Sequence, residues 1–149
     1  MKPIHFAVVI AWTSVAACDR HAPTIRTDPD PILARVKLPA QVRNVVWTSE
    51  PVVKEGCIPA HDSPTRIHAF ISGYSGAAGE ATPGRIDVPR GVANELLPAS
   101  LRAKGVVNGE TVRFEGTTAN KSELERPDKA QVHQAVVTPE GLVLELWVR

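Results

Sequence analysis

Two tight turns in the last third of the chain constrain its fold more than any other feature. One is Asn108-Gly109, whose residues both tolerate the positive φ that a primed hairpin turn demands. The other is Thr138-Pro139-Glu140-Gly141, which has proline and glycine at the positions that a type I turn favours. Strand-forming residues flank both turns, so we predict two antiparallel hairpins here.

The last predicted strand, residues 142–148, alternates along its length. One face carries Leu142, Leu144, Leu146 and Val148, and the other carries Val143, Glu145 and Trp147. The chain ends in this strand, so losing its last residues should damage the fold. Trp147 is expected to pack on the sheet; if it lies on an outer face with Val143, the two would form a partner-binding surface.

Strand-forming residues also occupy three earlier segments, 42–47, 66–72 and 85–88. Residues 92–104 have helical spacing of apolar residues, but Pro98 removes a backbone hydrogen bond in their middle, which predicts two short helical pieces. Residues 73–84 are rich in Gly, Ala and Ser and predict a loop. The predicted fold class is mainly β or α+β, a small antiparallel sandwich or part-open barrel with a Pro-broken helical segment.

An uncharged apolar run, residues 6–17, follows a short start that contains Lys2. The run is shorter than the about 20 residues of a bilayer-spanning helix and fits the apolar region of a signal peptide. Its end, Val15-Ala16-Ala17-Cys18, resembles the lipobox of bacterial lipoproteins: an aliphatic residue, two small ones and a cysteine.

This resemblance implies that residues 1–17 are a signal peptide that is removed, and that Cys18 carries acyl chains that hold the protein on a bilayer. The expected location is the periplasmic side of the cell envelope. Asp19 resembles an inner-membrane retention signal, and the outer membrane is the alternative. An ordinary secretory cleavage would instead leave Cys18 free to form a disulfide with Cys57. Both interpretations predict export.

The segment 18–40 holds four prolines, Pro23, Pro29, Pro31 and Pro39. We interpret it as the lipidated cysteine and a semi-rigid tether, which could hold the domain up to roughly 60 Å from the membrane. Residues 32–38 could instead already form a strand or a short helix. Residues 41–149 are long enough for one β-rich globular domain.

The charge balance excludes one class of partner. Without Lys2, the 16 acidic residues are matched by as many basic ones. Nucleic-acid binding depends on clustered Lys and Arg, and the most basic stretch, residues 85–104, also contains Asp87 and Glu95. We therefore expect no nucleic-acid partner.

One group of residues suggests chemistry: Cys57 and His61, with His68 downstream. Thiolate and imidazole groups can bind zinc or copper, but a structural zinc site needs four ligands. A cysteine and a histidine can also act together as a nucleophile and its base. The acidic residues Glu123, Glu125 and Asp128 are interspersed with basic ones, which predicts a solvated loop rather than a paired-carboxylate site. No cofactor is expected.

The sequence thus favours a lipid-anchored periplasmic module that binds another envelope or secreted protein and is not an enzyme. An accessory subunit of an envelope or secretion machine and an inhibitor or immunity protein both fit this description. The alternative is a metal-binding protein or enzyme that uses Cys57, His61 and His68.

Overall fold

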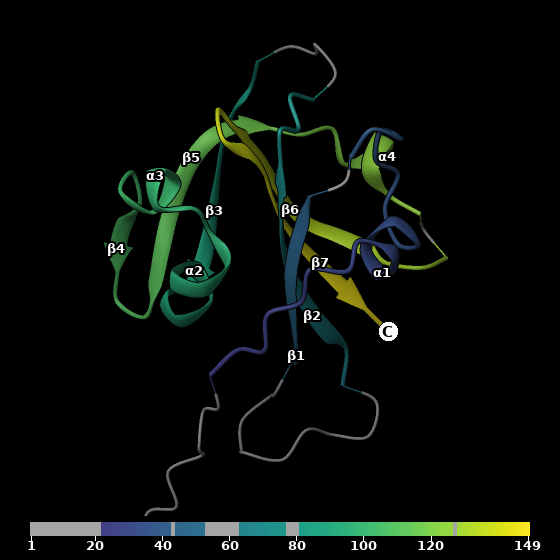
Figure 1. The fold of residues 1–149 in the computed structure, drawn as a ribbon, viewed down its shortest axis with the longest axis horizontal. Coiled ribbons are helices and arrows are strands. Elements are labelled where there is room, and N and C mark those ends of the chain that lie inside the picture. The colour runs from purple at the N-terminus through teal and green to yellow at the C-terminus, as the bar shows by residue number, and fades with distance from the viewer. Residues whose placement is uncertain (1–21, 43, 53–62, 77–80, 127) are drawn as a thin grey trace, which may run out of the picture.

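The structure is a computed structural model, and it describes residues 22–42, 44–52, 63–76, 81–126 and 128–149. Within these residues, seven strands form one antiparallel sheet in the order β1-β2-β7-β6-β5-β3, and β4 pairs with β5. The strands are β1 Val45–Pro51, β2 Thr65–Ser72, β3 Pro83–Pro89, β4 Val106–Asn108, β5 Thr111–Thr118, β6 Gln131–Thr138 and β7 Gly141–Val148. The mainly β prediction is confirmed, and the sheet is open rather than closed into a barrel (Figure 1).

Four short helices accompany the described strands: α1 Asp30–Leu33, α2 Arg90–Leu96, α3 Ala99–Arg102 and α4 Lys121–Leu124. The break between α2 and α3 falls at Pro98, as predicted. Leu97, just before it, is extended at φ −97° and ψ 144°. A residue that precedes proline avoids the helical region because the proline ring collides with its backbone, so the helix ends there.

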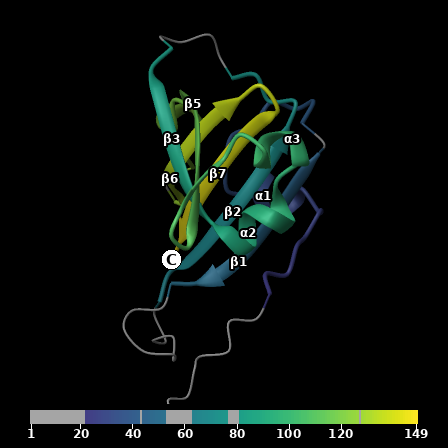
Figure 2. The same cartoon turned by 90° about the vertical axis from the view of Figure 1, so that its left-hand side faces the viewer.

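Each face of the sheet is covered by its own helices and has its own core. Alternate residues of β7 separate the two cores, because neighbouring side chains of a strand point to opposite faces. Leu142, Leu144 and Leu146 pack with Ile32 of α1 and Leu124 of α4 in the first core. The second core lies under α2 and α3 and contains Phe70, Val92, Leu96, Leu101, Phe114 and Val143. Figure 2 shows the strands side by side, and Figure 1 shows α2 and α3 on one side of β6 and β7 and α1 and α4 on the other.

The sheet divides where β5 leaves β6. Only Thr117 and Thr118 of β5 pair with β6, and β4 pairs with the other end of β5. A Cβ at Gly116 would collide with the carbonyl oxygen of Val137 on β6. Glycine therefore permits β5 and β6 to approach closely beside the short stretch where they pair.

The first hairpin differs from the prediction by one residue. Asn108 is the last residue of β4, and Gly109 and Glu110 form the turn. Only Gly109 has a positive φ, 60°, which fits a turn that needs glycine at its first central position alone. The second hairpin, with Pro139 and Glu140 between β6 and β7, is confirmed.

Part of the predicted tether belongs to the domain. Ile32 and Val36 are fully buried in the first core, and Arg26 pairs with Trp47 as a short antiparallel bridge on β1. Pro29 and Pro31 stand at the start of α1, where a missing N–H costs no hydrogen bond. Two of the four prolines that suggested an extended tether therefore begin a helix, as the alternative for residues 32–38 anticipated in part.

Candidate functional site

The structure describes three of the six residues singled out from the sequence. Cys18, Cys57 and His61 lie outside the described residues. His68 lies on β2, and Val143 and Trp147 lie on β7. Val143 is buried in the second core, so it contributes to packing and not to the exposed surface considered for Trp147.

His68 and Trp147 meet around a residue that was not singled out as a site, Glu145. Glu145 stands directly opposite His68 in the β2–β7 register, and Arg66 stands opposite Trp147. All four side chains share one face of the sheet. His133 of β6 stacks on the Trp147 ring with 4.9 Å between ring centroids. We call Arg66, His68, His133, Glu145 and Trp147 the Glu145 cluster.

Glu145 is the hub of this cluster. Its Oε1 accepts a 2.8 Å hydrogen bond from Trp147 Nε1 and lies 3.5 Å from Arg66 Nε. Its Oε2 lies 3.9 Å from His68 Nε2, beyond hydrogen-bond distance. Arg66 continues outward to Glu50, with 3.6 Å between Nη1 and Oε1. The buried carboxylate is thus held by one hydrogen bond and one close cation.

His68 is enclosed and has neither ring nitrogen hydrogen-bonded within the described residues. Burial lowers its pKa from 6.5 to about 4; the nearby Glu145 carboxylate opposes this shift, and Arg66 adds to it. The imidazole is therefore neutral at pH 7. Only 1% of its surface is exposed, and 6% of that of Glu145, so these two groups offer no approach to a substrate.

The described residues around His68 supply no further ligands for a metal ion. Within the part of the chain that the structure describes, no three His, Cys, Asp or Glu side chains gather as a metal site would require. The predicted grouping of Cys57, His61 and His68 remains a prediction for the two residues outside the described set.

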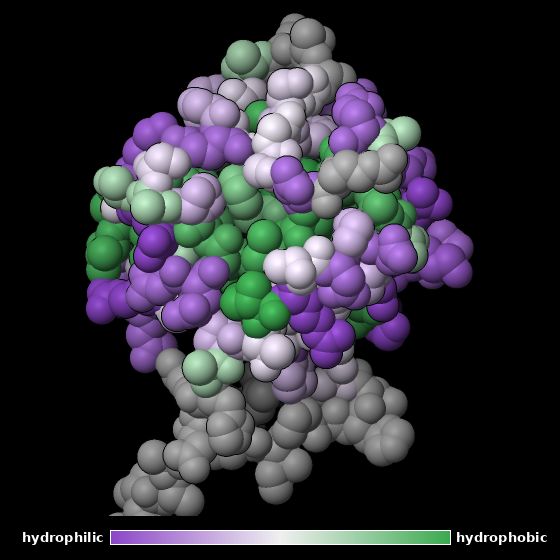
Figure 3. Space-filling view, viewed as in Figure 1, coloured by the Kyte–Doolittle hydropathy of each residue, from purple (hydrophilic) through white to green (hydrophobic). Residues whose placement is uncertain are grey.

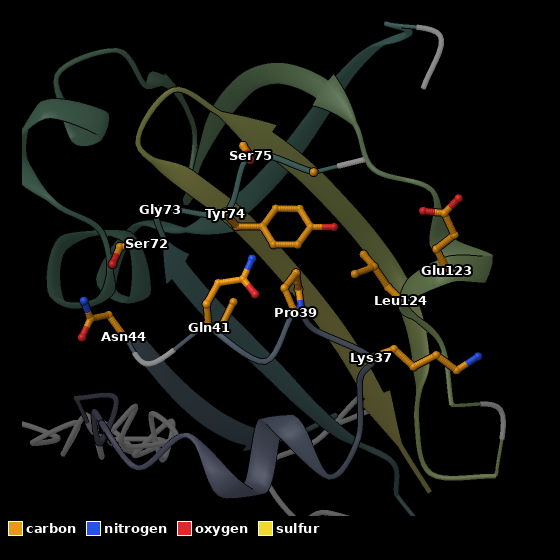
Figure 4. A pocket seen from close by; sticks show the side chains of 12 residues that line it. Lys37, Pro39, Gln41, Asn44, Ser72, Gly73, Tyr74, Ser75, Glu123 and Leu124 are labelled. Carbon is orange, nitrogen blue, oxygen red and sulfur yellow. The ribbon is translucent and has the colours of Figure 1, made fainter. Parts of the chain in front are cut away.

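The accessible site is an open pocket of about 650 Å³ beside the first core. Three chain segments line it: residues 37–42 and 44 before β1, the last residue of β2 with residues 73–76 after it, and α4. The lining side chains and glycines are Lys37, Pro39, Gln41, Val42, Asn44, Ser72, Gly73, Tyr74, Ser75, Gly76, Glu123 and Leu124. We call it the Tyr74 pocket. In Figure 4 the tyrosine ring lies across its middle, with the hydroxyl directed toward the side of Glu123 and Leu124.

Several polar side chains of the Tyr74 pocket have no hydrogen-bond partner in the part of the chain that the structure describes. The side chains of Gln41, Asn44 and Ser75 make no hydrogen bond within the described residues, and each is exposed. Partial burial, together with the nearby Glu123 carboxylate, raises the pKa of Tyr74, so its phenol stays protonated and can donate at neutral pH. The pocket therefore combines an aromatic ring with several unused donors and acceptors.

A second exposed feature is the outer edge of β4. Val106 and Val107 are the two large apolar residues exposed among those described, at 63% and 58%. Figure 3 shows apolar surface over β4 at the left edge of the molecule. β4 is only three residues long, which limits how much of a partner strand it could pair with.

Sequence reasoning missed the Tyr74 pocket because its walls come from distant segments. Residues 73–84 were expected to be a loop, and Glu123 was expected in a solvated loop, where the structure has α4. The available signal was Tyr74, the one tyrosine of the chain, standing between glycines in an otherwise small-residue stretch.

Comparison of the chain with descriptions of protein families, with curated proteins and with solved structures finds no match in any of the three. None of the described helices is long and apolar enough to cross a membrane.

Proposed function

We propose that this chain is an exported lipoprotein, anchored through Cys18 on the periplasmic side of a membrane, whose domain binds a component of the cell envelope. The observation that carries the binding function is the Tyr74 pocket. It is open, its volume falls within the roughly 300–1,000 Å³ of small-ligand sites, and the side chains of Gln41, Asn44 and Ser75 have no hydrogen-bond partner among the described residues. Within the Glu145 cluster, His68 and Glu145 are too deeply buried to meet a substrate, which supports binding rather than catalysis by these two groups.

The direction of the chain supports an anchor at Cys18. Arg26 pairs antiparallel with Trp47, so residues before Arg26 run toward the Pro51 end of β1. Asn44 and Ser72 of the pocket lie at the opposite end of β1 and β2. In Figure 1 the first described residues accordingly approach from below, and the segment after β2 lies at the top. An anchored domain would hold the pocket away from the bilayer.

The anchor is tested by metabolic labelling with an alkyne-bearing palmitate. Wild-type protein should become labelled and remain in the membrane fraction, because acyl chains hold a protein on a bilayer. The Cys18→Ser variant should lose the label entirely and should leave that fraction or accumulate uncleaved. Cys57→Ser is the matched control and should label like the wild type. Equal labelling of Cys18→Ser and wild type would contradict the anchor.

The binding function is tested by placing a photoreactive amino acid at position 41 in intact cells. Gln41 is exposed and lines the pocket, so irradiation should give one dominant adduct. The same group at Glu115, exposed on β5 away from the pocket, is the control and should not give that adduct. Identical patterns from both positions, or none from position 41, would count against a ligand in the pocket.

A further inference from the structure

The Tyr74 pocket has a chemistry that selects among ligands. Its described lining has one cation, Lys37, and one carboxylate, Glu123. Opposite charges of equal number give no preference for an anion such as a phosphate or for a cation. The described lining therefore matches a ligand without net charge.

The remaining polar groups each donate and accept hydrogen bonds. Gln41 and Asn44 supply carboxamides, and Ser72, Ser75 and Tyr74 supply hydroxyls. Groups with both capacities complement a ligand whose own groups have both, which is the property of hydroxyls and amides. None of the five side chains forms a hydrogen bond within the described residues, so no described group competes with a ligand for them.

The aromatic ring supplies the apolar part of the site. Tyr74 is half-buried and packs against the first core, which fixes the ring, and Figure 4 shows it broadside. Gly73 and Gly76 flank it, each with φ 71°, a conformation that side-chain-bearing residues rarely adopt. Gly76 lies beside one edge of the ring, because a Cβ added there would stand 3.5 Å from Tyr74 Cε1. The negative face of an aromatic ring attracts the polarised C–H groups of a ligand that lies flat against it.

We propose that the Tyr74 pocket binds a neutral saccharide, with a sugar ring stacked on Tyr74 and its hydroxyl or acetamido groups bonded to Gln41 and Asn44. A sugar ring combines a flat C–H face with a rim of groups that donate and accept, which matches both parts of the pocket. This inference deepens the proposed binding function and rests on it.

The test is a titration of the folded domain with two neutral oligosaccharides, chitotriose and maltotriose, followed by amide chemical shifts in NMR. At least one should shift the resonances of residues 72–76 and saturate below about 10 mM, as a millimolar Kd requires. Tyr74→Ala should weaken binding at least about tenfold, and Tyr74→Phe, which keeps the ring, should weaken it less. Gln41→Ala, at an exposed position, separates a loss of binding from a loss of folding and should also weaken it.

The matched control is Val107→Ala, exposed on β4 away from the pocket, which should bind like the wild type. Binding that survives both Tyr74→Ala and Gln41→Ala would overturn the assignment to this pocket. Failure of both sugars to bind, with position 41 still giving a protein adduct in cells, would overturn the saccharide while leaving the proposed binding function in place. Failure of both experiments would remove the two proposals together.

Discussion

A chain that lacks residues 142–149 should show no cooperative unfolding transition. These residues form almost all of β7, which lies between β2 and β6 and pairs with both. Leu142, Leu144 and Leu146 are fully buried, and truncating one buried leucine to alanine already costs about 2–5 kcal/mol. Losing three such leucines, together with the pairing of β7 on both sides, should cost more free energy than the about 5–15 kcal/mol by which an ordinary domain is stable. Thermal unfolding followed by circular dichroism measures the outcome.

Two variants show that the effect belongs to the strand and not to the chain end. Removing Arg149 alone, which is exposed and lies beyond β7, should leave the melting temperature unchanged. Leu144→Ala should destabilise by about 2–5 kcal/mol, and Val107→Ala, on exposed β4, should have almost no effect. A truncated chain that still melted in one sharp transition would contradict the central position of β7.

Acidification should destabilise the protein through His68. Its pKa is about 4 in the folded state, against the ordinary histidine value of 6.5, so the unfolded chain binds the proton more tightly. Above pH 6.5 the histidine is neutral in both states and the free energy of unfolding is at its full value. As the pH falls from 6.5 to 4, proton binding favours the unfolded chain and the free energy of unfolding decreases. The free energy of unfolding should decrease by about 3 kcal/mol between pH 6.5 and pH 4. Urea unfolding at pH 7.5 and pH 4.5 measures most of it.

The His68→Gln variant isolates this contribution from the carboxylates that titrate in the same range. A glutamine has no charge to gain, so the variant should lose about 2–3 kcal/mol less than the wild type between the two pH values. His133→Gln is the matched control: this histidine is exposed, and the variant should retain the wild-type pH dependence. Equal acid sensitivity of wild type and His68→Gln would show that the buried imidazole does not govern it.

The features that sequence predicted well depend on neighbours in the chain. Pro98 ends a helix through a clash with the residue before it, and the alternation of β7 follows from the two faces of one strand. The Pro139-Glu140 turn is likewise local. Asn108-Gly109 located its hairpin, but either of two adjacent residue pairs could form the turn. Pairing of Val107 with Val112 fixes it at Gly109 and Glu110.

The features that sequence missed depend on strand order and register. Glu145 becomes a hub only because β2 and β7 pair with His68 opposite it, about 77 residues apart in the chain. The Tyr74 pocket needs α4 beside residues 37–44, which the backbone bond from Lys37 N–H to the Leu124 carbonyl secures at 2.8 Å. No local pattern in either segment encodes that contact.

The bridge between Arg26 and Trp47 sets how far an anchored domain could range. The seven residues 19–25 separate Cys18 from it, and at full extension this stretch spans roughly 28 Å, little more than a third of the span of residues 18–40 at the same extension. An anchored domain would therefore stay close to the lipid headgroups. A saccharide fixed deeper in the envelope could reach the Tyr74 pocket only if one of its chains or branches extended to within that distance of the membrane. The length of the anchoring segment would therefore restrict the ligands by their distance from the membrane, in addition to the restriction by pocket chemistry.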